Sequence, residues 1–248
     1  MTINSKPPFT DQRVRQAVAL SMDRHTVTSV WLEGKGEPNV GPLIPPEVGG
    51  QWGISTEVMK RRPGYGEDKT ADLARARQLI TQAGIDPSKF PLVLLANTSW
   101  RGFGEVVERN LASLGFKVQL DVVDPGLISQ RELKGEFDVE TGTTSISFDD
   151  PADYLTPLVV TGGVKNFGKW SNPKLDAIML EQDRVLDLAK RKQMLIEAQE
   201  IILDDAVSIP IAVRRSHSGH LPWVKNYPTR LPVLFSSFFR WEQVYLER

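Results

Sequence analysis

The stretch from 148 to 211 decides the fold, and it opens with Phe148-Asp149-Asp150-Pro151-Ala152-Asp153-Tyr154-Leu155. It continues with Trp170-Ser171-Asn172-Pro173-Lys174-Leu175-Asp176 and closes with Asp187-Leu188-Ala189-Lys190-Arg191 and Asp205-Ala206-Val207-Ser208-Ile209-Pro210-Ile211. An acidic or amide side chain caps a helix start well, and proline fits the first helical turn. The stretch therefore predicts an aromatic and acidic loop, a proline-started helix, an aspartate-started amphipathic helix and a short apolar strand, in that order.

The beginning of the chain carries a second group of informative residues. It reads Lys6-Pro7-Pro8-Phe9, then Asp11-Gln12-Arg13-Val14-Arg15-Gln16-Ala17-Val18 and Met22-Asp23-Arg24. Together the two regions resemble the extracellular solute-binding proteins of the peptide/nickel class (family 5), which feed ABC importers. The resemblance spans nearly the whole chain and implies the second lobe (lobe II) of a two-lobe protein. Family members are far longer, so we expect a first lobe and an export signal to be absent from this chain.

The periodicity between these regions predicts an α/β fold. Helices are expected over 11–22, 23–33, 72–84, 102–114 and 126–133, and strands over 92–96, 117–123 and 137–141. Strands that alternate with helices predict a right-handed βαβ sheet with helices on both faces, like lobe II of the periplasmic binding proteins. We expect residues 1–213 to form this lobe, with an irregular Gly- and Pro-rich excursion over 34–66. Residues 214–248 are expected to form a tail that returns to the missing first lobe.

Composition excludes several classes of function. The 30 basic and 31 acidic residues give a net charge of −1, which argues against a nucleic-acid partner bound through its phosphates. There is no cysteine, so disulfides, thiolate metal sites and cysteine nucleophiles are excluded. No apolar run is long enough for a membrane helix, and the first residues form no signal peptide.

Candidate ligand-binding residues follow the predicted strands, because ligands of such sheets gather at the carboxyl ends of strands. These ends lie at 97–100, at 124–125 and in the hydroxyl-rich loop 142–149. Two interpretations stay open for the loop: a wall that faces the solute, or a connection in which Asp149 or Asp150 caps the next helix. Trp100 is either a platform for the solute or a side chain packed over the sheet edge. The candidates are Asn97, Trp100, Thr143, Ser145, Ser147, Phe148 and Asp149.

Ser147 bears on the identity of the solute. The resemblance implies that peptide-binding relatives have an aspartate at this position, four residues before Pro151, where it holds the α-ammonium of the ligand. A hydroxyl cannot neutralise a buried cation. Ser147 therefore shifts the expectation from free peptides toward sugars, opine-like compounds or other solutes of the same family.

Three apparent motifs do not indicate a function. Residues 163–169 have the spacing of a phosphate-binding loop, but Trp170 stands where the motif needs Ser or Thr. His217 and His220 lie three apart, yet His25 is the one other histidine, so a dedicated metal site is not expected. No nucleophile elbow or zincin motif is present, and adjacent acids such as Asp204 and Asp205 rarely act as glycosidase pairs. We expect no enzyme activity and no cofactor.

The sequence thus predicts the solute-binding component of an ABC importer, which captures a small polar solute between two lobes. Its expected partners are the solute, the membrane permease subunits and the missing lobe, in a periplasmic or extracellular membrane-associated setting. The alternative is a stand-alone cytoplasmic α/β enzyme or sensor domain. The tail holds many apolar residues, so we also expect it to fold back or to self-associate.

Overall fold

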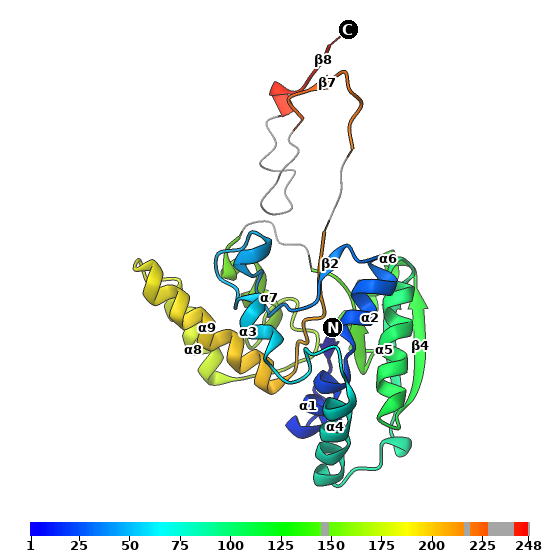
Figure 1. Cartoon of the computed structure of the whole chain (residues 1–248). Coiled ribbons are helices and arrows are strands. Elements are labelled where there is room, and N and C mark those ends of the chain that lie inside the picture. Colours follow the sequence, from blue (N-terminus) through cyan, green and yellow to red (C-terminus); the bar gives the residue numbers. More distant parts are fainter. Residues whose placement is uncertain (145–148, 216–218, 228–240, 248) are drawn as a thin grey trace.

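The computed structural model describes residues 1–144, 149–215, 219–227 and 241–247, and Figure 1 shows their arrangement. The helices are α1 Gln12–Ser21, α2 Arg24–Thr26, α3 Thr56–Lys60, α4 Thr70–Ala83, α5 Arg101–Ser113, α6 Pro125–Lys134, α7 Pro151–Val159, α8 Pro173–Gln182 and α9 Leu188–Asp205. The strands are β1 Thr2–Ile3, β2 Gly36–Glu37, β3 Pro91–Asn97, β4 Lys117–Val123, β5 Val139–Thr141, β6 Val213–Arg214, β7 Val224–Lys225 and β8 Tyr245–Leu246. A π-helical turn over Val27–Trp31 extends α2.

The central sheet is mixed and has the strand order β1-β5-β3-β4. Its middle strand β3 runs parallel to both β4 and β5, as the alternation of strands and helices predicted. The edge strand β1 runs antiparallel to β5 and was not predicted, because two residues are too few to show a strand period. The carboxyl ends of β3, β4 and β5 therefore meet at one edge of the sheet.

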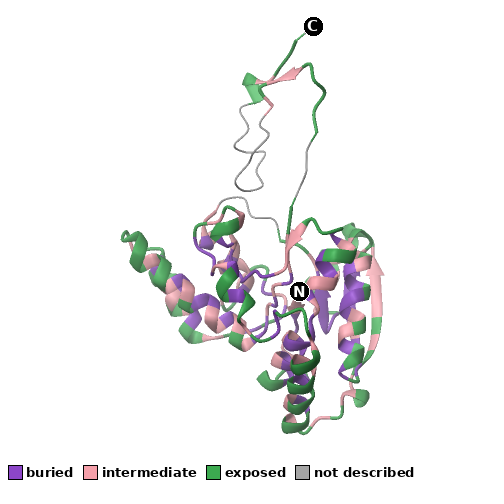
Figure 2. Ribbon diagram, in the orientation of Figure 1, coloured by how far each residue is buried: buried purple, intermediate pink, exposed green. Residues whose placement is uncertain are grey.

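Helices flank the sheet and share its apolar core. Val106, Val107 and Leu111 of α5 are buried together with Leu92 and Leu94 of β3, and α1 and α4 extend this cluster through Val14, Val18 and Ile80. Figure 2 shows the buried residues of these helices facing one another, with exposed residues on their outer sides. In contrast, no side chain of α6 is buried.

A second apolar cluster joins α7, α8 and α9 to the excursion over 34–66. Leu43 and Trp52 of the excursion pack with Leu155, Leu175 and Leu195. The fully buried Gln199 of α9 fixes this contact: its Oε1 accepts from the amides of Leu43 (3.4 Å) and Ile54 (3.3 Å), and its Nε2 donates to the carbonyl of Trp52 (2.9 Å). Besides irregular backbone, the excursion contains β2, a 3-10 turn over Pro46–Val48 and α3.

Several predicted helix ends are confirmed by their caps. Asp11 accepts a hydrogen bond from the amide of Arg13 at the start of α1, and Asp187 accepts from the amides of Ala189 and Lys190 at the start of α9. Gly84 ends α4 in the left-handed conformation at φ 71°. The expected start of α4 at Asp72 was wrong: the helix begins at Thr70, and Asp72 accepts from the amide of Gly64 (3.0 Å) and pairs with Lys69 (2.9 Å).

The apolar segment 207–211 does not form the predicted strand. It makes a single bridge between Thr2 and Ser208, and a regular strand begins at Val213. Pro210 has no amide hydrogen to donate, so it interrupts the ladder at this point.

Beyond residue 218, the described parts of the tail lie apart from the body of the molecule (Figure 1). There β7 pairs with β8 in an antiparallel hairpin, and Lys225 forms an ion pair with Glu247 at 2.8 Å. Leu221, Trp223 and Leu246 are all more than half exposed. Among the described residues, no helix has the length and apolar character that crossing a membrane requires.

Candidate functional site

The carboxyl edge of the sheet brings two of the predicted segments together. On the parallel strands β3 and β5, Ala96 lies opposite Thr141. Asn97 and Thr143 therefore leave the sheet from neighbouring strands, one at the end of β3 and the other two residues beyond β5. Thr98–Trp100 then forms a single 3-10 turn that leads into α5. Of the residues at this edge, Thr143 is exposed, whereas Asn97 and Trp100 are half-buried.

Trp100 stands on a small aromatic cluster. Its ring centre lies 4.9 Å from that of Trp31 with the planes at 63°, which is an edge-to-face contact. Trp31 in turn stacks on the buried Phe103 of α5 at 5.4 Å and 22°. Gly102 makes this packing possible, because a β-carbon there would lie 2.9 Å from Cδ1 of Trp31. Trp100 is thus both packed against the protein and partly open to solvent.

A cation lies over the ring of Trp100. The guanidinium of Arg214 lies 5.4 Å from the centre of the Trp100 ring. Arg214 is placed there by β6, which pairs with β2 so that Arg214 lies opposite Gly36. Its side chain is exposed, and within the described residues no carboxylate lies within 4 Å of it. The positive charge of Arg214 is therefore available to an anionic group at this edge.

Asn97 contributes a buried acceptor. Its Oδ1 is inaccessible to solvent and has no hydrogen-bond partner in the described part of the chain. Leaving such a group unpaired costs about 1–3 kcal/mol. A buried acceptor left without a partner at the carboxyl end of a strand is a candidate for a bond from a ligand donor.

The far end of the loop is held by α7 and α9. Asp150 caps α7 by accepting from the amide of Ala152 (2.9 Å), and its carboxylate pairs with Arg191 of α9 at 3.0 Å. Arg191 also donates to Gln182 (2.8 Å) and lies over the ring of Trp52 at 4.8 Å. Of the two roles weighed for the acids of this loop, the helix cap is thus confirmed for Asp150.

Asp149 has a different environment from its neighbour. Its main-chain carbonyl accepts from Nε1 of Trp52 (2.8 Å), while its Oδ2 is buried with no hydrogen-bond partner among the described residues. Burial raises the pKa of the Asp149 carboxyl, an amide hydrogen bond from Gln51 opposes the rise, and the charge of Asp150 adds to it. Oδ2 of Asp149 is therefore a second buried acceptor without a partner among the described residues.

The candidate residues divide into three groups. Asn97, Trp100 and Thr143 gather at the carboxyl edge, and Asp149 lies where the loop joins α7. Ser145, Ser147 and Phe148 lie outside the described residues, so their roles stay predictions. Sequence reasoning missed Trp31, Arg214, Trp52 and Arg191. A tryptophan in the last turn of a predicted helix, three residues before Gly34, was a visible signal for Trp31. The other three are defined by contacts distant in sequence.

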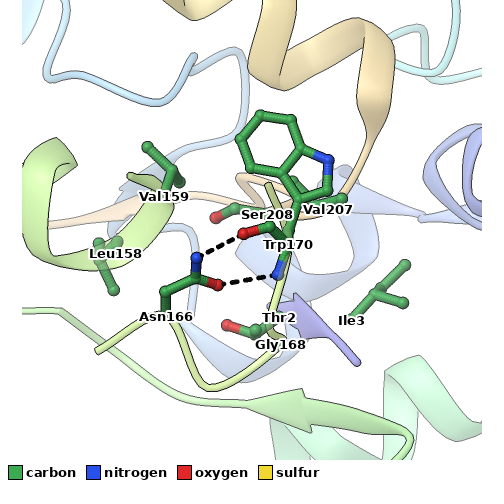
Figure 3. A pocket seen from close by; sticks show the side chains of 9 residues that line it. All are labelled: Thr2, Ile3, Leu158, Val159, Asn166, Gly168, Trp170, Val207 and Ser208. Carbon is green, nitrogen blue, oxygen red and sulfur yellow. Dashed lines mark hydrogen bonds between the residues drawn. The ribbon is translucent and has the colours of Figure 1, made fainter. Parts of the chain in front are cut away.

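Figure 3 shows a small void that none of these residues lines; its lining includes Ile3, Val159, Asn166 and Trp170. Its volume of about 10 Å³ leaves room for at most one water molecule. The amide of Asn166 donates to the carbonyls of Trp170 (2.7 Å) and Val160 (3.1 Å), and its oxygen accepts from the amide of Trp170 (3.2 Å). These bonds fold the glycine-rich segment 163–169 into turns between α7 and α8, so we assign the void a structural role.

No metal site emerges from the part of the chain that is described, where no three His, Cys, Asp or Glu side chains cluster. His220 stacks on Tyr227 with 5.1 Å between ring centres, and His217 lies outside the described residues.

Comparison with known proteins gives one family. Residues 1–166 match the family described as bacterial extracellular solute-binding proteins, family 5 Middle. The chain is 26% identical over 241 residues to the periplasmic oligopeptide-binding protein OppA of Escherichia coli, covering 93% of this chain and 42% of that protein. It is 24% identical over 243 residues to heme-binding protein A of Haemophilus influenzae, covering 94% of this chain and 42% of that protein.

A solved structure shows the same fold. The periplasmic binding protein DppA of Helicobacter pylori, in complex with the peptide STSA, is 25% identical, with a TM-score of 0.80. The match covers 100% of this chain and 46% of that one. The chain therefore spans less than half the length of the relatives that it matches.

Proposed function

The chain belongs to the bacterial extracellular solute-binding proteins of family 5, and we propose that it forms the second lobe of a two-lobe receptor for an ABC importer. The family consists of solute-binding proteins rather than enzymes, which supports this proposal over a stand-alone enzyme or sensor domain. The mixed sheet flanked by helices is compatible with the expected lobe II, in which helices cover both faces.

The observation that carries the proposal is the half-built site at the carboxyl edge. Trp100 offers a partly exposed ring on an aromatic base. Among the described residues, the cation of Arg214 has no acidic partner and Oδ1 of Asn97 has no donor. A ligand pocket is normally concave and surrounds most of its ligand. We take this edge as one wall of the site, with the other wall supplied by the second lobe of a receptor that closes around its solute.

We infer that the solute is small and polar and carries a carboxylate. Arg214 is suited to bind a carboxylate, because a charge-assisted bond from a guanidinium is among the stronger polar contacts in proteins. Oligopeptides and opine-like compounds have this group, and neutral sugars do not. The peptide bound by the Helicobacter pylori relative supplies a suitable probe.

The remaining partners follow from the same proposal. A solute receptor of an importer acts in the periplasm or, membrane-associated, on the extracellular side, and the periplasmic relatives support this location. It delivers its solute to the permease subunits in the membrane. The tail is proposed to pack on the first lobe in the longer protein. Trp223, Trp241 and Tyr245 of the tail are exposed, so we expect the isolated chain to self-associate. Size-exclusion chromatography with light scattering measures the mass of the species formed.

Nuclear magnetic resonance on the chain itself tests the site. Titration of the ¹⁵N-labelled chain with the peptide Ser-Thr-Ser-Ala should shift the indole signal of Trp100 and leave that of the buried Trp170 in place. A Trp100→Phe variant assigns the signal. If no resonance at the carboxyl edge moves at about 10 mM peptide, where millimolar binding would be nearly saturated, the proposed site is wrong.

A further inference from the structure

A second cavity, of about 270 Å³, lies between helices α1, α4 and α9 and the segment that follows α9. None of the residues that line it belongs to the carboxyl edge of the sheet. Its lining includes Arg24, Arg62, Arg75, Leu79, Leu203 and Ile209. Three arginines and a single acid, Asp204, face the same space.

Arg24 is a buried cation for which the described part of the chain supplies no counter-ion. Its side chain belongs to a residue that is 2% exposed, and its guanidinium lies 4.0 Å above the ring of Tyr65. Its Nε donates to the carbonyl of Pro210 (3.0 Å) and its Nη1 to that of Gly64 (2.8 Å). Nη2 makes no hydrogen bond to any described residue, and no described carboxylate lies within 4 Å. Because an uncompensated buried charge is costly, Arg24 should favour an anion beside it.

The other two arginines differ from each other. Arg62 is already neutralised, because it pairs with both Glu200 and Asp204. Arg75 is exposed on α4 and has neither an ion pair nor a hydrogen bond within the described part of the chain. The cavity therefore presents two available cations, one buried and preorganised and one at the surface.

The rest of the lining is largely apolar. Leu20, Leu79, Leu203 and Ile209 form much of the wall. An apolar cavity of about 150 Å³ is large enough for benzene, so this one has room for a ring with a short side chain. Cations and apolar walls in one cavity match a ligand that has an anionic end and an apolar body.

We propose that this cavity binds a small amphipathic monocarboxylate, such as an arylalkanoate. The carboxylate pairs with the guanidinium groups of Arg24 and Arg75, and the apolar body packs on Leu79, Leu203 and Ile209. This site is separate from the proposed solute site and does not depend on it.

Titration of the ¹⁵N-labelled chain with 3-phenylpropionate tests the proposal. The amide signals of Gln16, Leu79 and Asp204 should shift saturably, with a dissociation constant in the low millimolar range or below. The neutral isostere 3-phenylpropanamide should bind at least about fivefold more weakly, since it lacks the charge. The indole signal of Trp100 should stay in place, which separates this site from the carboxyl edge.

Variants locate the site. Arg75→Gln should weaken binding about fivefold without loss of fold, because the side chain is exposed and unpaired. Arg77→Gln is the control: Arg77 lies on the same helix, is exposed, donates to the carbonyl of Ser113 (3.3 Å) and does not line the cavity. Ala19→Phe, which fills the cavity from α1, should abolish binding, with thermal unfolding as the check on its fold. Equal binding of acid and amide, equal losses in the two arginine variants, or no saturable shift at these amides would overturn the proposal.

Discussion

Arg214 lies 5.4 Å from the ring centre of Trp100, although the two residues belong to elements far apart in the sequence. The contact connects β6, which contains Arg214, to the turn that follows the carboxyl end of β3, which contains Trp100. It places an exposed cation over the one tryptophan that the sequence had marked as a candidate for the site.

Arg214→Gln should weaken the binding of peptides with a free carboxyl terminus about fivefold, as followed by the indole signal of Trp100. Peptides with an amidated carboxyl terminus should bind the variant and the unchanged chain equally. Arg215→Gln is the matched control, because Arg215 is the adjacent exposed arginine. A similar loss in Arg215→Gln, or for amidated peptides, would show that Arg214 makes no specific contact.

Gly102→Ala should disturb the aromatic cluster. The new methyl group would lie 2.9 Å from Cδ1 of Trp31 and push that ring against Trp100. Overpacking of this kind costs about 1–3 kcal/mol of unfolding free energy and should shift the indole signals of both tryptophans. Gly126→Ala is the control at the equivalent position of α6, where nothing lies within 4 Å, and it should be neutral or slightly stabilising. Equal stability of the two variants would contradict the packing described for Trp31.

Asp150→Ala should destabilise the far end of the loop. It removes the cap of α7 and leaves Arg191 without its closest carboxylate, for a combined loss of about 2 kcal/mol in urea unfolding. Glu181→Ala removes an exposed ion pair with Arg184 at 3.6 Å and should change stability by less than about 0.5 kcal/mol. If the two substitutions cost the same, Asp150 does not anchor the loop.

Much of the fold could be predicted because its signals are local. The apolar run Leu92–Ala96 by itself indicates a buried strand. Asp187 marks the start of α9 because it is a capping residue directly before an amphipathic segment. The role of Gln199 could not be predicted, because its partners Leu43 and Ile54 are brought near only by tertiary packing. The strand predicted over 207–211 was wrong for a different reason. Its apolar residues suggested a strand, but Pro210 has no amide hydrogen to donate to a neighbouring strand. At the site, Trp100 and Asn97 could be predicted as candidates because they come directly after a strand. Arg214 could not, because the pairing of β6 with β2 brings it there.

Glu140 should make stability depend on pH. Burial raises the pKa of its carboxyl from 4.5 to about 8, the neighbouring Glu132 adds to the rise, and the charge of the Met1 ammonium opposes it. The folded protein therefore binds a proton more tightly than the unfolded chain, so this contribution to stability is present below pH about 4.5 and is lost as the pH rises toward about 8. Glu140→Gln stays neutral, and its unfolding free energy should gain a few kcal/mol relative to the unchanged chain between about pH 5 and pH 8.5. Parallel urea-unfolding profiles of the two proteins would refute this assignment.

The central claim is that this chain supplies one wall of a solute site that a second lobe completes. The most direct measurement is isothermal titration calorimetry of Ser-Thr-Ser-Ala, or of another solute found in the titrations above, with the chain alone and with a two-lobe protein that contains residues 1–248 as its second lobe. Closure buries the solute between two walls, so the two-lobe protein should bind at least about 100-fold more tightly, and the chain alone should show no saturable micromolar binding. Tight, stoichiometric binding by the chain alone, with no gain from the first lobe, would contradict the account.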